Sequence, residues 1–106
     1  GIIGVSFKPN SPVTIGSPSV RLIEDLSKTN KIIYVFDELD ETYDNLNGLG
    51  DSTIKCVSPQ ECVDKSELVI LMHPSKKYVT LKKNGQEFVD NWGIFTSDAL
   101  FTSISD

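Results

Sequence analysis

Short apolar segments alternate with amphipathic segments along the chain. The apolar segments are rich in β-branched and aromatic residues, as strands are. We predict strands over residues 2–6, 31–36, 53–57, 67–72 and 93–96, the fourth of them buried on both faces because Leu68–Leu71 is continuously apolar. Strands that alternate with helices imply right-handed βαβ crossovers and parallel pairing. The expected fold class is therefore α/β, a three-layer Rossmann-like domain with a mostly parallel sheet of about five strands.

Capping residues mark the starts of two helices. Ser17 and Pro18 suit the N-cap and first helical position, which predicts a helix that stops at Asn30. Ser58 and Glu61 form a capping box, which predicts a brief second helix. Weaker patterns suggest a loop or frayed helix over residues 38–44, a helical turn over 75–81 and another short helix over 86–91.

The loops that follow the strands are the expected ligand-facing part of such a fold. Parallel sheets bind ligands beyond the carboxyl ends of their strands, at the point where the strand order reverses. We expect this rim to comprise residues 7–16, 37–41, 73–77 and 96–99.

Length and charge narrow the class of partner. The 106 residues fit one domain, and the formal net charge of −5 argues against nucleic acid or an anionic membrane surface as a ligand. The charge does not exclude a phosphate, which one lysine and a few backbone N–H groups can hold. No apolar run approaches about 20 residues, and no signal peptide is visible. The only two cysteines, Cys56 and Cys62, are expected to be reduced thiols of a cytoplasmic protein.

The loop after the first strand differs from a dinucleotide-binding loop. A Gly-x-Gly-x-x-Gly loop lets the backbone approach a pyrophosphate, but after Gly4 this chain has no further glycine until Gly16. The domain is therefore not expected to bind NAD alone. Asp37, at the end of the second strand, is expected to cap or hydrogen-bond a loop rather than bind a ribose. Phe7 and Lys8 combine a stacking surface with a cation, which suits a nucleotide, although the pattern alone favours a core Phe beside a solvated Lys.

One segment has a more specific pattern. The stretch Gly4-Val5-Ser6-Phe7-Lys8-Pro9-Asn10-Ser11, followed by the Ser17-Pro18 helix start, resembles the UDP-binding C-terminal domain of the UDP-glucose/GDP-mannose dehydrogenase family. The signature of that family is G-[LVF]-[AS]-F-K-x-x-[ST]-x-D-x-R-E-S-P. Tyr34-Val35-Phe36-Asp37, the region from Glu61 to Met72 and Ile94-Phe95 extend the similarity over nearly the whole chain at lower specificity.

The resemblance implies a role for this chain within a larger enzyme. Members oxidise the C6 alcohol of a UDP- or GDP-sugar to a carboxylate by two hydride transfers to NAD. Another domain binds NAD, and a central region contains the catalytic cysteine and mediates dimerisation. Residues 1–106 then correspond to the C-terminal nucleotide-sugar-binding domain, which is a fragment of a longer, homo-oligomeric parent enzyme. The fragment alone is not expected to be active. The implied substrate-binding residues are Phe7, Lys8, Pro9 and Asn10, and the further rim candidates are Ser11, His73 and Asp98.

Two positions depart from the family pattern. Ile15 replaces an arginine that reaches NAD, and Asp98 falls where an arginine contacts the substrate. A carboxylate there would repel a phosphate. These departures motivate the alternative of a catalytically diverged interaction module that keeps the fold. A phosphoacceptor receiver domain shares the alternating pattern but needs acidic residues after the first strand, where this chain has Phe7 and Lys8. Cys56 and Cys62 are not expected to be the catalytic thiol, which the family places upstream of this domain.

Overall fold

The fold is built on a parallel sheet. The computed structural model describes residues 1–6, 8–9, 11–44, 46, 52–74 and 76–90. Within these ranges the strands are β1 (Ile2–Ile3), β2 (Ile33–Phe36), β3 (Thr53–Lys55), β4 (Leu68–Leu71) and β5 (Glu87–Asp90). Their order is β3-β2-β1-β4-β5, and all four neighbouring pairs are parallel. The predicted α/β fold with about five strands is confirmed.

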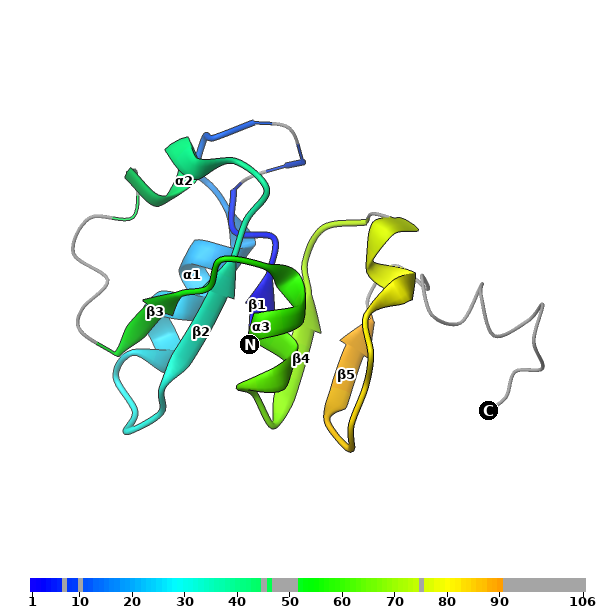
Figure 1. The fold of residues 1–106 in the computed structure, drawn as a ribbon. Helices are drawn as coiled ribbons and strands as arrows, with labels where there is room; N and C mark the ends of the chain where they lie inside the picture. Colours follow the sequence, from blue (N-terminus) through cyan, green and yellow to red (C-terminus); the bar gives the residue numbers. More distant parts are fainter. Residues whose placement is uncertain (7, 10, 45, 47–51, 75, 91–106) are drawn as a thin grey trace.

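Helices cover both faces of the sheet, so the predicted three layers are also confirmed. The helices in the described residues are α1 (Pro18–Leu26), α2 (Asp40–Asp44), α3 (Pro59–Asp64) and the 3₁₀ helix η1 (Lys76–Thr80). Figure 1 shows α1 behind the sheet and α3 in front of it. On the α1 face, Ile23 packs in one core cluster with Ile2, Ile33 and Val35. On the other face, Val63 of α3 and Tyr78 of η1 belong to a second cluster with Ile3, Val69 and Leu71.

The predicted helix starts are confirmed by their caps. Ser17 Oγ accepts from the N–H of Val20 at 3.2 Å, and Ser58 Oγ accepts from the N–H of Glu61 at 3.1 Å. Helix α1 ends at Leu26, before the predicted stop at Asn30. Hydroxyl groups that follow it compete for its last carbonyls, since Thr29 Oγ1 donates to Leu26 O at 2.6 Å. The helical alternative for residues 38–44 is the one found, as α2.

The last strand lies elsewhere than predicted. Residues 86–91 were expected to form a short helix, but Glu87–Asp90 is strand β5, paired with β4. Its Glu-Phe-Val-Asp sequence alternates in exposure, as an edge strand does, and Gly85 precedes it with φ +89°. The strand predicted over residues 93–96 lies outside the described residues.

Strand β4 is less buried than its apolar sequence suggests. Val69 and Leu71 are fully buried beneath α3 and η1, whereas Leu68 on the opposite face is 44% exposed. The expectation of burial on both faces is therefore wrong at Leu68. Among the described residues, no helix is long and apolar enough to cross a membrane.

Candidate functional site

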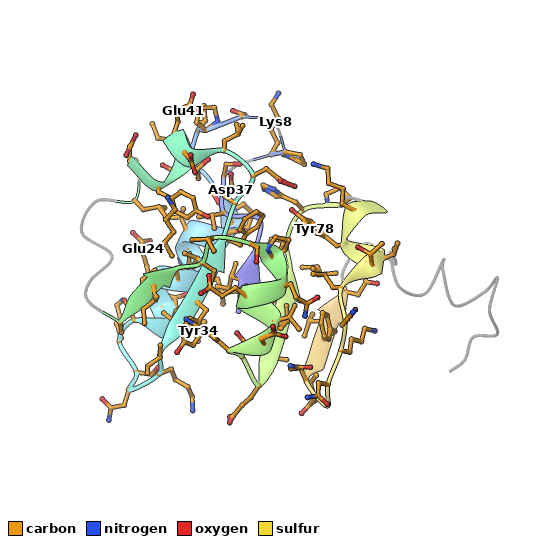
Figure 2. The ribbon with its side chains drawn as sticks, viewed as in Figure 1. Lys8, Glu24, Tyr34, Asp37, Glu41 and Tyr78 are labelled. Atoms are coloured by element: carbon orange, nitrogen blue, oxygen red, sulfur yellow. The ribbon has the colours of Figure 1, made fainter. Side chains whose placement is uncertain are left out.

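The strand order reverses at β1, which has β2 on one side and β4 on the other. The chain crosses through α1 from β1 to β2, and β4 lies against the other edge of β1, so the loops that follow these strands separate at their carboxyl ends. The predicted rim segments after β1, β2 and β4 all leave this edge, where Figure 2 labels Lys8, Asp37 and Glu41. The fourth predicted segment, residues 96–99, lies outside the described residues.

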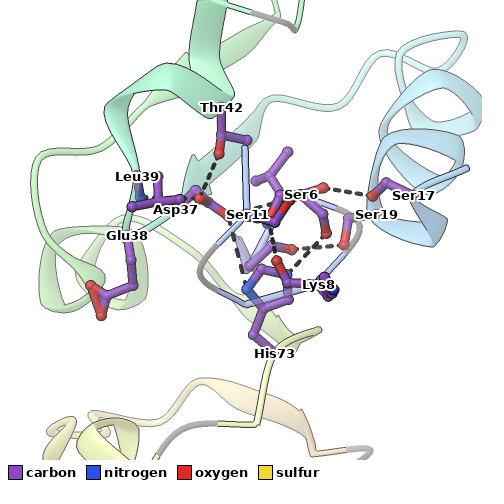
Figure 3. A network of polar contacts seen from close by, with 12 residues as sticks. Ser6, Lys8, Ser11, Ser17, Ser19, Asp37, Glu38, Leu39, Thr42 and His73 are labelled. Carbon is purple, nitrogen blue, oxygen red and sulfur yellow. Dashed lines mark hydrogen bonds and ion pairs between the residues drawn. The ribbon is translucent and has the colours of Figure 1, made fainter. Parts of the chain in front are cut away.

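The carboxylate of Asp37 holds the chain that leaves β1. Its Oδ1 accepts from the backbone N–H groups of Val5, at 2.8 Å, and Ser6, at 3.2 Å. Its Oδ2 accepts from the N–H of Leu39 at 3.1 Å and from the hydroxyl of Thr42 at 2.8 Å (Figure 3). The residue is 4% exposed, and four protein donors occupy its carboxylate. These contacts match the loop hydrogen bonds predicted for Asp37 and leave it unsuited to bind a ribose hydroxyl.

The carbonyl groups of the same segment are also held by side chains. Three donors reach three consecutive carbonyls: Ser19 Oγ to Gly4 O at 2.7 Å, Ser17 Oγ to Val5 O at 2.6 Å and His73 Nε2 to Ser6 O at 3.0 Å. The donors come from α1 and from the end of β4, and Figure 3 shows them around one segment. We call the set of Ser17, Ser19, Asp37, Thr42 and His73 the anchoring network. Among the described residues, no buried side-chain nitrogen or oxygen lacks a partner, so this network is internally satisfied.

Tyr43 of α2 contacts the backbone of Asp37, a member of the anchoring network. Its hydroxyl accepts from the N–H of Asp37 at 2.6 Å. Burial, with the nearby negative charge of Asp37, raises the pKa of Tyr43 to about 12. The phenol therefore stays protonated at neutral pH and serves as a fixed hydrogen-bonding group.

Lys8 lies next to the anchoring network and is exposed. Its backbone carbonyl accepts from Ser6 Oγ at 2.8 Å, and its side chain projects from the rim. Among the described residues Lys8 has no ion-pair partner, whereas Lys77 of η1 is paired with Glu38 at 3.1 Å. The loop thus presents an exposed cation at the edge where α/β folds bind anionic ligands.

The other predicted site residues are placed as follows. Pro9 is exposed and Ser11 is half-buried, on the same loop as Lys8. His73 is 5% exposed and lies beneath the rim, within the anchoring network. Ile15, which the resemblance predicted to replace an arginine, is 88% exposed. Phe7, Asn10 and Asp98 lie outside the described residues.

The described part of the site lacks two features of a dinucleotide-binding domain. The loop lacks the glycine cradle, and the Asp37 carboxylate that would receive a ribose hydroxyl already accepts from four protein groups. The sequence does not mark Ser6, Ser19 and Thr42 as members of the site. The only signal for them was that small hydroxyl residues flank the loop and the β2 end, which is also common in ordinary loops.

The cysteines are buried core residues away from this rim. Cys56 and Cys62 pack in the cluster under α3. Burial raises the pKa of the Cys62 thiol to about 12 and also raises that of Cys56. Both thiols are therefore protonated at neutral pH and poor nucleophiles.

Comparisons with known proteins agree with this geometry. The family model described as UDP-glucose/GDP-mannose dehydrogenase family, UDP binding domain, matches residues 1–97. A solved UDP-glucose dehydrogenase from the hyperthermophilic archaeon Pyrobaculum islandicum is similar, with a TM-score of 0.74 and 30% sequence identity. The match covers 85% of this chain and 21% of that chain, so this chain spans about a fifth of its relative. A search of curated proteins found no match.

Proposed function

Because this chain belongs to the UDP-glucose/GDP-mannose dehydrogenase family, we propose that it binds the nucleotide end of a UDP- or GDP-sugar as the C-terminal domain of a longer dehydrogenase. The main support is Lys8, an exposed cation at the carboxyl edge of the sheet whose backbone carbonyl is held by Ser6. A nucleoside diphosphate carries its negative charge on the diphosphate, which a lysine ammonium attracts and donates to. Residues 1–106 are proposed to constitute this domain.

The proposed contacts follow the loop after β1. Lys8 would meet the diphosphate, and Phe7 would stack on a flat part of the ligand, with Pro9, Asn10 and Ser11 beside them. In the described part of this loop, Lys8 and Pro9 are exposed. The backbone at Val5 and Ser6, which precedes them, is held by buried groups, so these two residues would need little ordering on binding.

The parent enzyme is proposed to oxidise the C6 alcohol of the sugar with NAD, which other domains would hold. Binding of NAD by other domains agrees with two features of this chain. Its first loop lacks the glycines of a dinucleotide site, and the Asp37 carboxylate accepts hydrogen bonds from protein groups. The isolated chain is expected to be inactive. A homo-oligomeric parent in the cytoplasm belongs to the same proposal.

One observation favours a second candidate function. Ile15 is 88% exposed on the loop where the family places an arginine that reaches NAD. An apolar residue in that position suits a protein contact better than a dinucleotide, so a diverged interaction module is the alternative. Dehydrogenase activity of the parent protein would exclude it.

We predict that Lys8→Ala weakens binding of UDP or GDP by about tenfold or more, since charge-assisted hydrogen bonds contribute about 1.5–3 kcal/mol. Calorimetric titration of the protein with each nucleotide measures this. Lys28→Ala is the matched control, because Lys28 is an exposed lysine just beyond α1, and it should leave the affinity unchanged. Absence of binding by the unaltered protein, or equal affinity with and without the Lys8 side chain, would contradict the proposal.

A further inference from the structure

His73 is packed and oriented more tightly than a rim residue needs to be. It follows β4, is 5% exposed, and its ring lies against Gly4. A Cβ atom added to Gly4 would lie 2.4 Å from His73 Cγ, so the absence of a side chain at Gly4 is what makes room for the imidazole. This packing leaves Nε2 of His73 3.0 Å from the carbonyl oxygen of Ser6.

The hydrogen bond fixes which nitrogen bears a proton. A carbonyl oxygen only accepts, so Nε2 is the donor. The other ring nitrogen, Nδ1, is 3.9 Å from Asp37 Oδ1, which is beyond hydrogen-bonding distance.

Ser6 links this buried imidazole to the exposed loop. Its N–H donates to Asp37, its carbonyl accepts from His73, and its hydroxyl donates to the carbonyl of Lys8 at 2.8 Å. Three atoms of one residue thus form hydrogen bonds, with Asp37 just after β2, with His73 just after β4 and with the loop itself. His73 fixes the peptide that precedes the proposed ligand contacts, and the next bond in the series is to the backbone of Lys8.

We propose that His73 is a positioning residue for nucleotide binding, which holds the Ser6 carbonyl and, through the hydroxyl of Ser6, the carbonyl of Lys8, so that the Lys8 ammonium meets a diphosphate with little reordering of the backbone at these two residues. This inference rests on the proposed function and adds to it a residue that does not touch the ligand. A loop that must order on binding loses affinity by the cost of that ordering. His73 raises the affinity because it holds the Ser6 backbone in place before the nucleotide binds.

The test compares His73→Met with His73→Gln, which have similar length and volume but differ in the donor. The terminal amide of Gln can donate to Ser6 O, whereas the thioether of Met cannot. With UDP as the probe in calorimetry, His73→Met is expected to bind about tenfold more weakly than the unaltered protein, and His73→Gln within about threefold of it. His73→Asn is one methylene shorter, cannot reach Ser6 O, and should bind as weakly as the Met variant. It replaces that variant if His73→Met does not fold.

A double substitution separates positioning from general destabilisation. In a Lys8→Ala background, His73→Met should weaken UDP binding by less than about twofold, because the side chain that His73 positions is gone. Equal UDP affinity of the unaltered protein and of the folded Met or Asn variant would overturn the inference, as would a full tenfold loss that persists in the Lys8→Ala background. Failure of the unaltered protein to bind UDP or GDP at all would instead contradict the proposed function.

Discussion

Replacing Asp37 with alanine is expected to lower the free energy of unfolding by about 3–5 kcal/mol, because several buried donors lose their acceptor at once and each unsatisfied donor costs about 1–3 kcal/mol. The substitution leaves the N–H groups of Val5, Ser6 and Leu39 and the hydroxyl of Thr42 without their acceptor. Domains of this size are stable by only about 5–15 kcal/mol. Urea denaturation followed by circular dichroism measures the change.

Two control variants identify the cause of this loss. Asp37→Asn keeps the shape and one accepting oxygen, so its effect should be intermediate. Asp25→Ala removes a carboxylate that is 61% exposed and weakly paired with Arg21, at 4.0 Å, so it should change stability by less than about 0.5 kcal/mol. If Asp37→Ala and Asp25→Ala shift the urea midpoint equally, the anchoring network does not stabilise the fold.

Gly4→Ala is expected to be the second most damaging change, at about 3 kcal/mol, from backbone strain of about 1–2 kcal/mol and overpacking of about 1–3 kcal/mol. Gly4 has φ +95°, which L side chains rarely adopt, and the added Cβ would meet the buried ring of His73 at 2.4 Å. The same urea denaturation experiment measures the loss. Because His73 must move, UDP binding should weaken as well.

Gly85→Ala is the matched control for this substitution. Gly85 has a similar φ, +89°, but an added Cβ there meets nothing within 4 Å. It should therefore show only the strain, about 1–2 kcal/mol. Equal losses at Gly4 and Gly85 would mean that the contact with His73 contributes nothing.

The fold was predictable because its signals are local. The Ser17-Pro18 and Ser58–Glu61 caps and the short apolar runs are readable within a few residues, and the structure has helices and strands at those places. Strand β5 was missed because four residues of weak alternation, Glu87–Asp90, contain too little periodicity to distinguish strand from helix. Its identity depends on pairing with β4 rather than on its own sequence.

The site was predictable only in outline, because its contacts are long-range. The position of Lys8 after β1 follows from the strand order, and a loop role for Asp37 was expected from the missing glycines. The partners of Asp37 and His73 were not, since Val5 is 32 residues from Asp37 and Ser6 is 67 residues from His73 along the chain. Nothing local to His73 indicates that its ring fills the space left by Gly4.

We propose that the nucleotide binds at the carboxyl edge of the sheet, beside Lys8. A cavity of about 670 Å³ exists at the opposite, amino-terminal edge, lined in part by Gly1, Lys31 and Lys65. Amide chemical-shift mapping of the ¹⁵N-labelled protein during titration with UDP distinguishes these two places. We predict that the shifts concentrate at Lys8 and Ser11, with smaller ones at His73 and none around the amino-terminal cavity. Shifts confined to that cavity, or no shifts with either UDP or GDP, would contradict the account.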